Sequence, residues 1–430
     1  MNDHDTEKMA SLLISKGMDR IQDVNNADVV IVNTCCIREK AEQKFYSLMG
    51  RLRKIKRQKG FILGVTGCIA QQEKEGIGDK LPFIDFSLGP SCIHRIAEAV
   101  DLASRKDRFF DFSDNGCTES LFISPVNADK KVKAFVTIMK GCNNFCSYCV
   151  VPYVRGREAS RDSADVIGEI ENLSRLGVKE ITLLGQNVNS YNKGRDDLSF
   201  PELLKRMNAI AGIERIRFVT SHPRDLSREL IECFGTLNKV CESIHLPFQA
   251  GSDRILKLMN RGYSIGEYRE KVALLRQMCK NIAITADCIV GFPGESEEDF
   301  EMTMDLVRDI KFDGLFSFVY SPRKFTVAAT LPGSITTEVA FERLSRLQKY
   351  QKSVTLDSNR AMEGKVAEVL VEDRSKNSDE EVTGRTRANK IVNFRGSLDM
   401  IGNLVEVEIV KGYANSLKGE PSKPRGGCIC

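Results

Sequence analysis

Strand-like and helix-like patterns alternate along most of this chain, and the alternation constrains the fold more than any other feature of the sequence. In the first hundred residues, short apolar runs at 28–33, 61–65 and 83–88 indicate buried strands. Helical patterns follow at 39–56 and 93–104. Because strands that are joined through helices run parallel, we predict an N-terminal parallel α/β domain over residues 1–104.

A second series of strand and helix patterns begins at residue 133, after a stretch at 105–132 that loses the periodicity and that we interpret as a linker. Six strands are expected in this series, at 135–139, 180–184, 215–220, 243–246, 282–290 and 315–320. Six βα units predict a partial (β/α)6 barrel over 133–358, with functional loops at the C-terminal ends of its strands.

After residue 359 the pattern changes to short strands, at 366–371, 381–386, 391–394 and 404–410. Strands this short and closely spaced predict a small all-β barrel over 359–418. The end at 419–430 carries Pro and Gly, and we expect it to be a flexible tail. The predicted fold class is therefore α/β with an added small all-β barrel.

Composition limits the setting in which the chain works. The acidic start has no apolar core, and apolar runs stop after a few residues, so we expect a cytoplasmic protein without a signal or membrane span. The 63 Lys and Arg exceed the 59 Asp and Glu by only +4, which permits an anionic partner without demanding one. Disulfides are rare in a reducing compartment, so the clustered members of the 14 cysteines are read as metal ligands.

Three cysteines follow the first strand of the expected barrel with the spacing C-x-x-x-C-x-x-C: Cys142, Cys146 and Cys149. Three thiolates can hold three irons of a 4Fe–4S cluster and leave the fourth iron open to a small ligand. The alternative is a structural zinc site, which closes with four ligands. A fourth Cys or His is missing nearby, which favours the cluster.

This cysteine motif resembles that of the radical S-adenosylmethionine (SAM) enzymes. The resemblance implies that SAM chelates the open iron through its amino and carboxylate groups, and that the reduced cluster cleaves it to a 5′-deoxyadenosyl radical. Tyr148 stands where those enzymes have an aromatic residue beside the adenine, although a core tyrosine is an equal alternative. Further SAM-pocket candidates at strand ends are Gln186, Gln249 and Asp287, whose alternative role is to stabilise loops.

The segments around the cysteines narrow the resemblance to the methylthiotransferases, and most closely to those that modify tRNA. These segments are MKGCNNFCSYC at 139–149, VPYVRGRE at 151–158, LGQNVNSY at 184–191, HLPFQAGS at 245–252, MNRGY at 259–263 and VGFPGE at 290–295. The resemblance implies an N-terminal domain with a second cluster, a radical SAM barrel and an RNA-binding barrel called TRAM.

The family reaction replaces the C2–H of N6-dimethylallyladenosine at tRNA position 37, next to the anticodon, with a methylthio group. The resemblance implies two 4Fe–4S clusters and two uses of SAM, one for the methyl group and one for the radical. It also implies a tRNA partner, an electron donor such as flavodoxin or ferredoxin and a sulfur donor. We expect a monomer.

Cys35 and Cys68 match two ligands of the family's auxiliary cluster, and each ends a predicted strand. The family places another cysteine just before the Met-Asn pair that is Met1-Asn2 here, so that ligand is absent from this chain or replaced. Cys36 is the obvious substitute, but consecutive side chains point apart on extended backbone. Cys92 and Cys117 are weaker candidates. Without a third thiolate we expect a labile auxiliary cluster and failed methylthiolation, with the radical site intact.

Three other features stand out. The C-terminal barrel offers Arg385, Arg387, Lys390 and Arg395 as possible RNA backbone contacts, by resemblance rather than by net charge. The stretch at 321–329 departs from the family through Lys324, Phe325 and Val327, and we expect it to pack differently without changing the chemistry. The Cys428-Ile429-Cys430 ending is read as a disordered end or stray metal ligand rather than a prenylation signal.

Three rival functions remain. A methylthiotransferase that modifies a ribosomal-protein aspartate is the nearest enzyme alternative. The others are a radical SAM protein impaired in methylthiolation and a non-catalytic iron–sulfur RNA-binding protein. An intact three-cysteine motif argues against mere binding, since an open iron serves chemistry.

Overall fold

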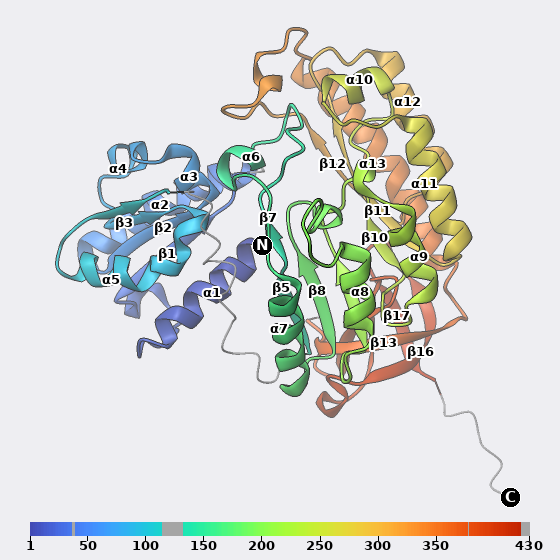
Figure 1. Ribbon diagram of the computed structural model, residues 1–430, viewed down its shortest axis with the longest axis horizontal. Helices are drawn as coiled ribbons and strands as arrows, with labels where there is room; N and C mark the ends of the chain where they lie inside the picture. The colour runs from blue at the N-terminus through green and yellow to red at the C-terminus, as the bar shows by residue number, and fades with distance from the viewer. Residues whose placement is uncertain (37–38, 114–131, 377, 423–430) are drawn as a thin grey trace, which may run out of the picture.

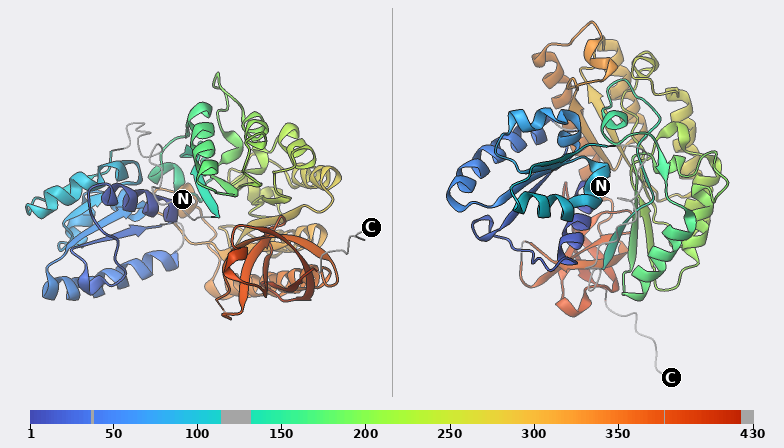
Figure 2. Two further views of the ribbon diagram at one scale, coloured as in Figure 1. Left: turned by 90° about the horizontal axis from the view of Figure 1, so that it is seen from below. Right: turned by 60° about the vertical axis from the view of Figure 1, so that its left-hand side comes forward.

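The computed structural model describes residues 1–36, 39–113, 132–376 and 378–422. Its elements form an N-terminal sheet with helices, a central arc of parallel strands covered by helices, and a small barrel at the C-terminal end (Figure 1). The N-terminal part and the C-terminal barrel lie against different sides of the central part (Figure 2). This arrangement confirms the predicted fold class.

The N-terminal domain is built on a parallel sheet of order β1-β2-β3-β4. Its strands are β1 (Val29–Thr34), β2 (Ile62–Gly67), β3 (Phe86–Leu88) and β4 (Phe109–Asp111). Alternate residues of β1 face opposite sides of the sheet, so Val30 and Val32 join one apolar cluster while Val29 and Ile31 join the other. Its helices are α1 (Asn2–Ile14), α2 (Glu39–Lys59), α3 (Cys68–Glu73), α4 (Gly76–Lys80) and α5 (Ile96–Ser104).

Several N-terminal elements were not predicted, among them β4, α1, α3 and α4. Strand β4 lies inside the stretch that the sequence indicated as a linker, where its three residues are too few to show a period. Helix α1 packs Met9 against the apolar face of α5. The rest of the predicted linker, 114–131, and Cys117 with it lie outside the described residues.

The central domain contains the six predicted strands in two parallel sheets, β5-β8-β9 and β10-β11-β12. A parallel bridge between Ile216 and Val240 joins the two sheets. The strands are β5 (Lys133–Thr137), β8 (Glu180–Leu184), β9 (Arg215–Phe218), β10 (Ser243–His245), β11 (Ala283–Val290) and β12 (Gly314–Val319). A short hairpin, β6 (Met139–Lys140) and β7 (Ala159–Ser160), extends the end of β5.

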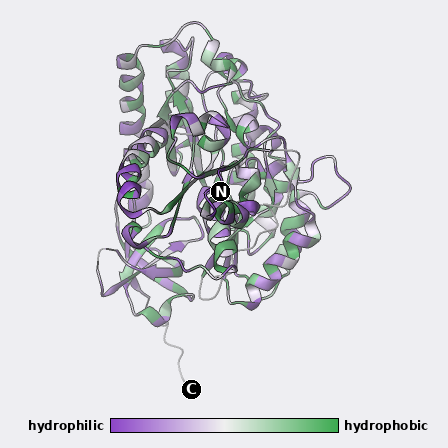
Figure 3. Ribbon diagram, turned by 90° about the vertical axis from the view of Figure 1, so that its left-hand side faces the viewer, coloured by the Kyte–Doolittle hydropathy of each residue, from purple (hydrophilic) through white to green (hydrophobic). Residues whose placement is uncertain are grey.

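Helices cover the outer face of these strands and bury the largest apolar cluster of the molecule. They are α7 (Ser163–Arg175), α8 (Phe200–Asn208), α9 (Arg228–Thr236), α10 (Asp253–Leu258), α11 (Ile265–Met278), α12 (Glu297–Ile310) and α13 (Thr337–Arg360). Capping boxes begin α8, α11 and α12 and fix where each helix starts. Many of these helices carry both hydrophilic and hydrophobic residues, as expected when one face is buried (Figure 3).

The C-terminal barrel closes in the order β13-β14-β15-β17-β16. Its strands are β13 (Val366–Arg374), β14 (Glu381–Thr386), β15 (Ile391–Arg395), β16 (Leu404–Gly412) and β17 (Leu417–Pro421). The flexible-tail prediction from residue 419 was therefore wrong at its start, because β17 runs to Pro421 and pairs with both β15 and β16. The Cys428-Ile429-Cys430 ending lies outside the described residues.

Candidate functional site

The three cysteines of the motif lie in a loop, residues 141–150, between β6 and the short helix α6 (Val151–Val154). Gly141 opens the loop with φ +75°, and a Cβ there would lie 2.0 Å from the Arg157 carbonyl oxygen. The Cys142 amide donates to the Gly156 carbonyl at 3.2 Å, and the Cys149 amide donates to the Cys146 carbonyl at 2.9 Å. The backbone therefore holds the three thiols at the C-terminal end of the barrel, where enzymes of this architecture keep their active sites.

The thiols sit in surroundings that suit metal-bound sulfur. Burial raises the pKa of Cys142 to about 11 and that of Cys149 to about 12, so ionising them requires a cation. In the described part of the chain, no three His, Cys, Asp or Glu side chains gather around the position of a single ion. A structural zinc site closes with four ligands, whereas three thiolates can hold three irons of a cluster and leave the fourth iron open, so the loop suits a cluster better.

Arg261 is the functional candidate that sequence reasoning missed. Its side chain is buried, and its Nη1 lies 3.5 Å from Cys146 Sγ while its Nη2 donates to the Pro247 carbonyl at 2.8 Å. Nearby, the Asn260 amide donates to the Phe145 carbonyl at 3.0 Å. The MNRGY segment that supported the family resemblance thus braces the cysteine loop, which its letters alone did not indicate.

The predicted SAM-pocket residues fall in two places. Tyr148 is partly buried, and its hydroxyl lies 3.3 Å from Arg261 Nη1. Gln186 accepts a hydrogen bond from the Gly141 amide, so in this structure it holds the start of the cysteine loop. Tyr148 is therefore part of the cysteine loop, and Gln186 adjoins it. The contact of Gln186 is the loop-stabilising one that was given as its alternative role.

Gln249 follows β10 and pairs with β11, and Asp287 lies within β11 beside it. The Gln249 backbone amide donates to the Asp287 backbone carbonyl at 2.9 Å. His245 Nε2 lies 3.4 Å from Asp287 Oδ2. The Gln249 Oε1 atom is buried and has no hydrogen-bond partner among the described residues. An acceptor without a partner at this depth suits a polar ligand.

A second group of thiols lies in the N-terminal domain, at the C-terminal ends of β1 and β2. Cys68 begins α3 directly after β2, and the buried Cys36 thiol donates a hydrogen bond to its sulfur. That bond, together with the Arg155 guanidinium, lowers the pKa of Cys68 to about 6. Cys35 is partly exposed and adjoins Cys36.

The sequence argument against Cys36 assumed extended backbone, but β1 ends at Thr34, so strict alternation no longer applies at the cysteines. The other substitute considered, Cys92, instead donates to the Ser113 carbonyl, with a sulfur–oxygen distance of 3.2 Å. The scattered cysteines Cys233, Cys241, Cys279 and Cys288 are buried and belong to the core.

Elements that carry the two thiol groups meet at the boundary between the N-terminal domain and the barrel. Arg155, at the end of α6, pairs with Asp5 at 2.8 Å and hydrogen-bonds the Cys68 sulfur. Lys140 donates to Ser91 at 3.0 Å, and Lys324 pairs with Glu73 at 2.6 Å across the same boundary. Figure 1 shows α6 between the barrel and the helices of the N-terminal sheet.

The four predicted RNA contacts of the C-terminal barrel differ in their partners within the protein. Arg387 pairs with Glu242 at 2.7 Å and Lys390 with Asp313 at 3.3 Å, so both charges hold this barrel against the central domain. The backbone carbonyl of Arg385 accepts from the fully buried Arg215 at 2.6 Å, and its own guanidinium lies 3.6 Å from Glu372. Arg395 alone of the four is largely exposed, beside Glu380 at 3.6 Å.

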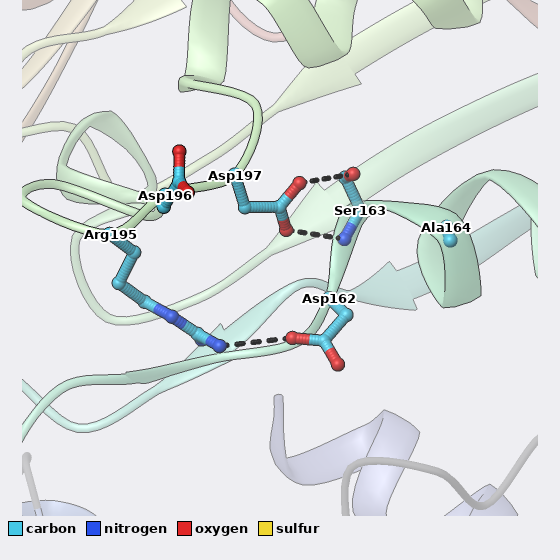
Figure 4. Close-up of a pocket in the computed structure, with 6 residues that line it drawn as sticks. All are labelled: Asp162, Ser163, Ala164, Arg195, Asp196 and Asp197. Carbon is cyan, nitrogen blue, oxygen red and sulfur yellow. Dashed lines mark hydrogen bonds and ion pairs between the residues drawn. The ribbon is translucent and has the colours of Figure 1, made fainter.

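A cavity of about 420 Å³ lies at the start of α7, and none of its lining residues belongs to either thiol group. Arg195 pairs with Asp162 at 2.9 Å, while Asp197 accepts from the Ser163 amide and hydroxyl (Figure 4). These contacts satisfy the hydrogen-bonding groups at the beginning of α7. The cavity is a structural feature of that helix end.

Three family descriptions match the chain. "Radical SAM superfamily" matches residues 136–307, "Uncharacterized protein family UPF0004" matches 1–89, and "TRAM domain" matches 360–421. A barrel of this architecture with three cysteines at its strand ends defines a radical SAM enzyme. Membership of that superfamily implies a 4Fe–4S cluster and SAM.

Two relatives carry the name tRNA-2-methylthio-N(6)-dimethylallyladenosine synthase. The protein from Syntrophus aciditrophicus is 51% identical over 98% of this chain and 92% of its own length. The protein from Geobacter metallireducens is 50% identical over 98% of this chain and 96% of its own length. The chain belongs to the family of tRNA-2-methylthio-N(6)-dimethylallyladenosine synthases.

Solved structures agree on the fold. The radical SAM methyltransferase TsrM from Kitasatospora setae superimposes with a TM-score of 0.55 at 13% identity, over 76% of this chain and 74% of that one. The cobalamin-dependent radical enzyme OxsB gives a TM-score of 0.50 at 10% identity, over 81% of this chain and 53% of its own. Among the described residues, no helix combines the length and apolar character needed to cross a bilayer.

Proposed function

We propose that this protein replaces the C2–H of N6-dimethylallyladenosine at position 37 of tRNA with a methylthio group. The observation that carries the proposal is the full-length similarity to tRNA-2-methylthio-N(6)-dimethylallyladenosine synthases. It is combined with Arg155, which follows the cysteine loop of the radical SAM barrel and contacts Cys68 of the second thiol group.

One SAM would give its methyl group to the sulfur and leave as S-adenosylhomocysteine. A second SAM would take up one electron from the reductant and give methionine and the 5′-deoxyadenosine that carries away the C2 hydrogen. Bond formation between the resulting carbon radical and the methylthiolate would release one electron, which the second cluster would accept.

Cys142, Cys146 and Cys149 would hold the cluster of the radical SAM domain. When bound, that cluster supplies the electron that cleaves SAM. The Arg261 guanidinium stabilises a thiolate at Cys146 by its charge, and the unpartnered Gln249 Oε1 offers an acceptor for a polar group of SAM. Tyr148 and Asp287 are the other candidates for this pocket.

A second cluster would be held in the N-terminal domain by Cys35 and Cys68, with Cys36 as a third thiolate. The hydrogen bond from Cys36 to Cys68 supports this assignment, since it brings two sulfurs of adjacent strand ends into contact. Arg155 balances negative charge at Cys68. Sulfur from an external donor would be used here, at the boundary that faces the radical site.

The remaining partners follow from the reaction. An electron donor such as flavodoxin or ferredoxin and a sulfur donor are required, and we propose that a monomer in the cytoplasm takes up the tRNA.

The test is anaerobic reconstitution of the chain, followed by iron and sulfide analysis and incubation with prenylated tRNA, SAM, sulfide and a reductant. We expect about eight irons per chain, a loss of about four with Cys142→Ala and a loss of about four with Cys36→Ala. Nucleosides from the tRNA digest should contain the 2-methylthio product. About four irons in the unaltered chain, unaffected by Cys36→Ala, would exclude the second cluster.

The ribosomal-protein alternative has no support in the relatives' names. The same reconstituted enzyme with the ribosomal protein as substrate provides the control. Methylthiolation of its aspartate in place of the tRNA would contradict the proposal.

A further inference from the structure

Three aromatic side chains that the reaction does not use lie together at the surface beside the cysteine loop. They come from separate segments: Phe145 from the loop, Tyr153 from α6 and Phe325 from the loop after β12. Their exposed fractions are 37%, 42% and 60%. The ring centroids of Phe145 and Tyr153 lie 6.4 Å apart, and those of Tyr153 and Phe325 lie 6.2 Å apart. We name these three residues the aromatic patch.

Two of these exposed rings belong to residues with an unfavourable backbone conformation. Phe145 has φ +47° and Phe325 has φ +69°, both in the left-handed region that bulky residues avoid. The Thr326 hydroxyl donates to the Arg323 carbonyl at 2.7 Å and closes the turn that carries Phe325. An exposed ring on strained backbone gains little from folding, so its placement indicates a use outside the fold.

The patch is tied to the reactive centre. The Ala328 amide donates to the Ser147 carbonyl at 2.8 Å, so the loop that carries Phe325 is bonded directly to the loop that carries the cysteines. Phe145 itself lies between Cys142 and Cys146 in the sequence. The aromatic patch therefore lies on the cysteine loop and on the segments bonded to it.

Charge beside the patch selects the kind of partner. The Arg157 guanidinium lies over the Phe145 ring, 5.4 Å from its centroid, and forms no ion pair within the described part of the chain. Flat aromatic faces with an adjacent free cation fit an unpaired base and its phosphate, which is how proteins grip single-stranded RNA. The departure of residues 324, 325 and 327 from the family pattern, which we expected not to change the chemistry, then has a role in recognition.

We propose that the aromatic patch is a stacking platform for an unpaired base of the RNA anticodon loop, next to the adenosine that reacts, with Arg157 on the phosphate. The inference rests on the proposed function, since it assumes an RNA substrate. Phe325 is the outermost ring and carries the largest share of the stacking area.

The test measures the affinity of the reconstituted full chain for an anticodon stem-loop RNA that carries N6-dimethylallyladenosine. We expect Phe325→Ala to weaken binding about 5- to 100-fold, the range for loss of one base stack. The matched control is Phe341→Ala, which removes a ring of similar exposure, 57%, on α13 and should leave the affinity unchanged. Iron content and thermal unfolding verify that both variants fold, which their exposure favours.

A fluorescent version uses the absence of tryptophan from the sequence. Phe325→Trp places a single indole in the patch, and its emission should be quenched on RNA binding because a base stacks on it. The quenching should disappear with a stem-loop in which the stacked nucleotide is abasic, and Phe325→Ala should have no effect on that RNA.

Failure of this inference differs from failure of the proposed function. If the unaltered enzyme neither binds nor methylthiolates the RNA, the proposed function is wrong. If it does both while Phe325→Ala binds within twofold of it, the stacking platform is wrong. If Phe325→Ala keeps RNA affinity but slows reduction by flavodoxin, the patch serves the electron-donor protein and the RNA assignment is overturned.

Discussion

At the residue scale, His222 shows how burial sets a chemical state in the barrel. It precedes a short 3₁₀ turn, its ring lies edge-on to Tyr263 at 5.8 Å, and its Nδ1 accepts from the Arg224 amide at 3.2 Å. Burial lowers the pKa of His222 to about 2, with Arg261 adding repulsion. The ring is therefore neutral in the folded barrel at every pH at which the enzyme works.

This state predicts a pH dependence of stability. The unfolded chain protonates His222 near its ordinary pKa of about 6.5 while the folded chain does not, so the unfolded state binds more protons as the pH falls. Stability from this group is complete above pH 6.5 and declines below it, by about 2 kcal/mol between pH 7 and pH 5. Urea unfolding of the chain and of His222→Asn should show a shallower pH slope in the variant. Equal slopes would contradict the assignment of the neutral ring.

Single residues were also where prediction from sequence was weakest. The cysteine motif could be found because its spacing is set by chemistry that needs three thiolates. The arginines of the C-terminal barrel could not be assigned in the same way, because charge in a sequence does not reveal which carboxylate it meets. Arg387 meets Glu242, and that pair joins residues far apart in the chain.

At the scale of elements, the cysteine loop depends on one glycine. Gly141→Ala would force a side chain onto φ +75° and place its Cβ 2.0 Å from the Arg157 carbonyl oxygen, so the two ends of the loop could not close. We expect a loss of more than about 2 kcal/mol in unfolding free energy and poor retention of the cluster. The visible absorbance of the iron–sulfur cluster in the reconstituted protein measures how much cluster the variant retains.

Gly177→Ala is the matched control for this prediction. Gly177 also has a left-handed φ of +89°, but nothing lies within 4 Å of the position where its Cβ would be. It should lose only about 1 kcal/mol, with the cluster unaffected. Equal effects of the two substitutions would show that conformation alone, and not the closed loop, determines cluster binding.

Elements with a strong period were predicted to within a few residues, as β8 illustrates at Glu180–Leu184. The elements missed are short or lack such a period. Strand β17 contains Gly and Pro, and it becomes a strand only because β15 and β16 offer it hydrogen bonds. Pairing of this kind depends on partners distant in the sequence, which local patterns do not record.

At the scale of the whole molecule, the two thiol groups can cooperate only if the N-terminal domain stays docked on the mouth of the barrel. Three ion pairs and a hydrogen bond between described residues lie at this boundary, and they differ in burial. The Arg155–Asp5 pair has side chains only 9% exposed, whereas Lys324, paired with Glu73, is half exposed. Arg323 and Glu42, at 3.7 Å, and the Lys140–Ser91 hydrogen bond add weaker contacts. Docking should therefore depend mainly on Arg155.

Arg155→Gln leaves the buried Asp5 carboxylate without its partner and removes a donor from Cys68, which should weaken docking by about 3–5 kcal/mol. Adding Asp5→Asn should restore much of that loss, since the unpaired charge is gone, and the coupling in this double-mutant cycle should exceed about 1 kcal/mol. Lys324→Gln, at a screened pair, should change docking by less than about 1 kcal/mol. Amide hydrogen exchange of α1 and α6 measures docking directly. Additive effects of the two substitutions, or unchanged exchange in Arg155→Gln, would mean that apolar packing holds the domains and that Arg155 acts only on Cys68.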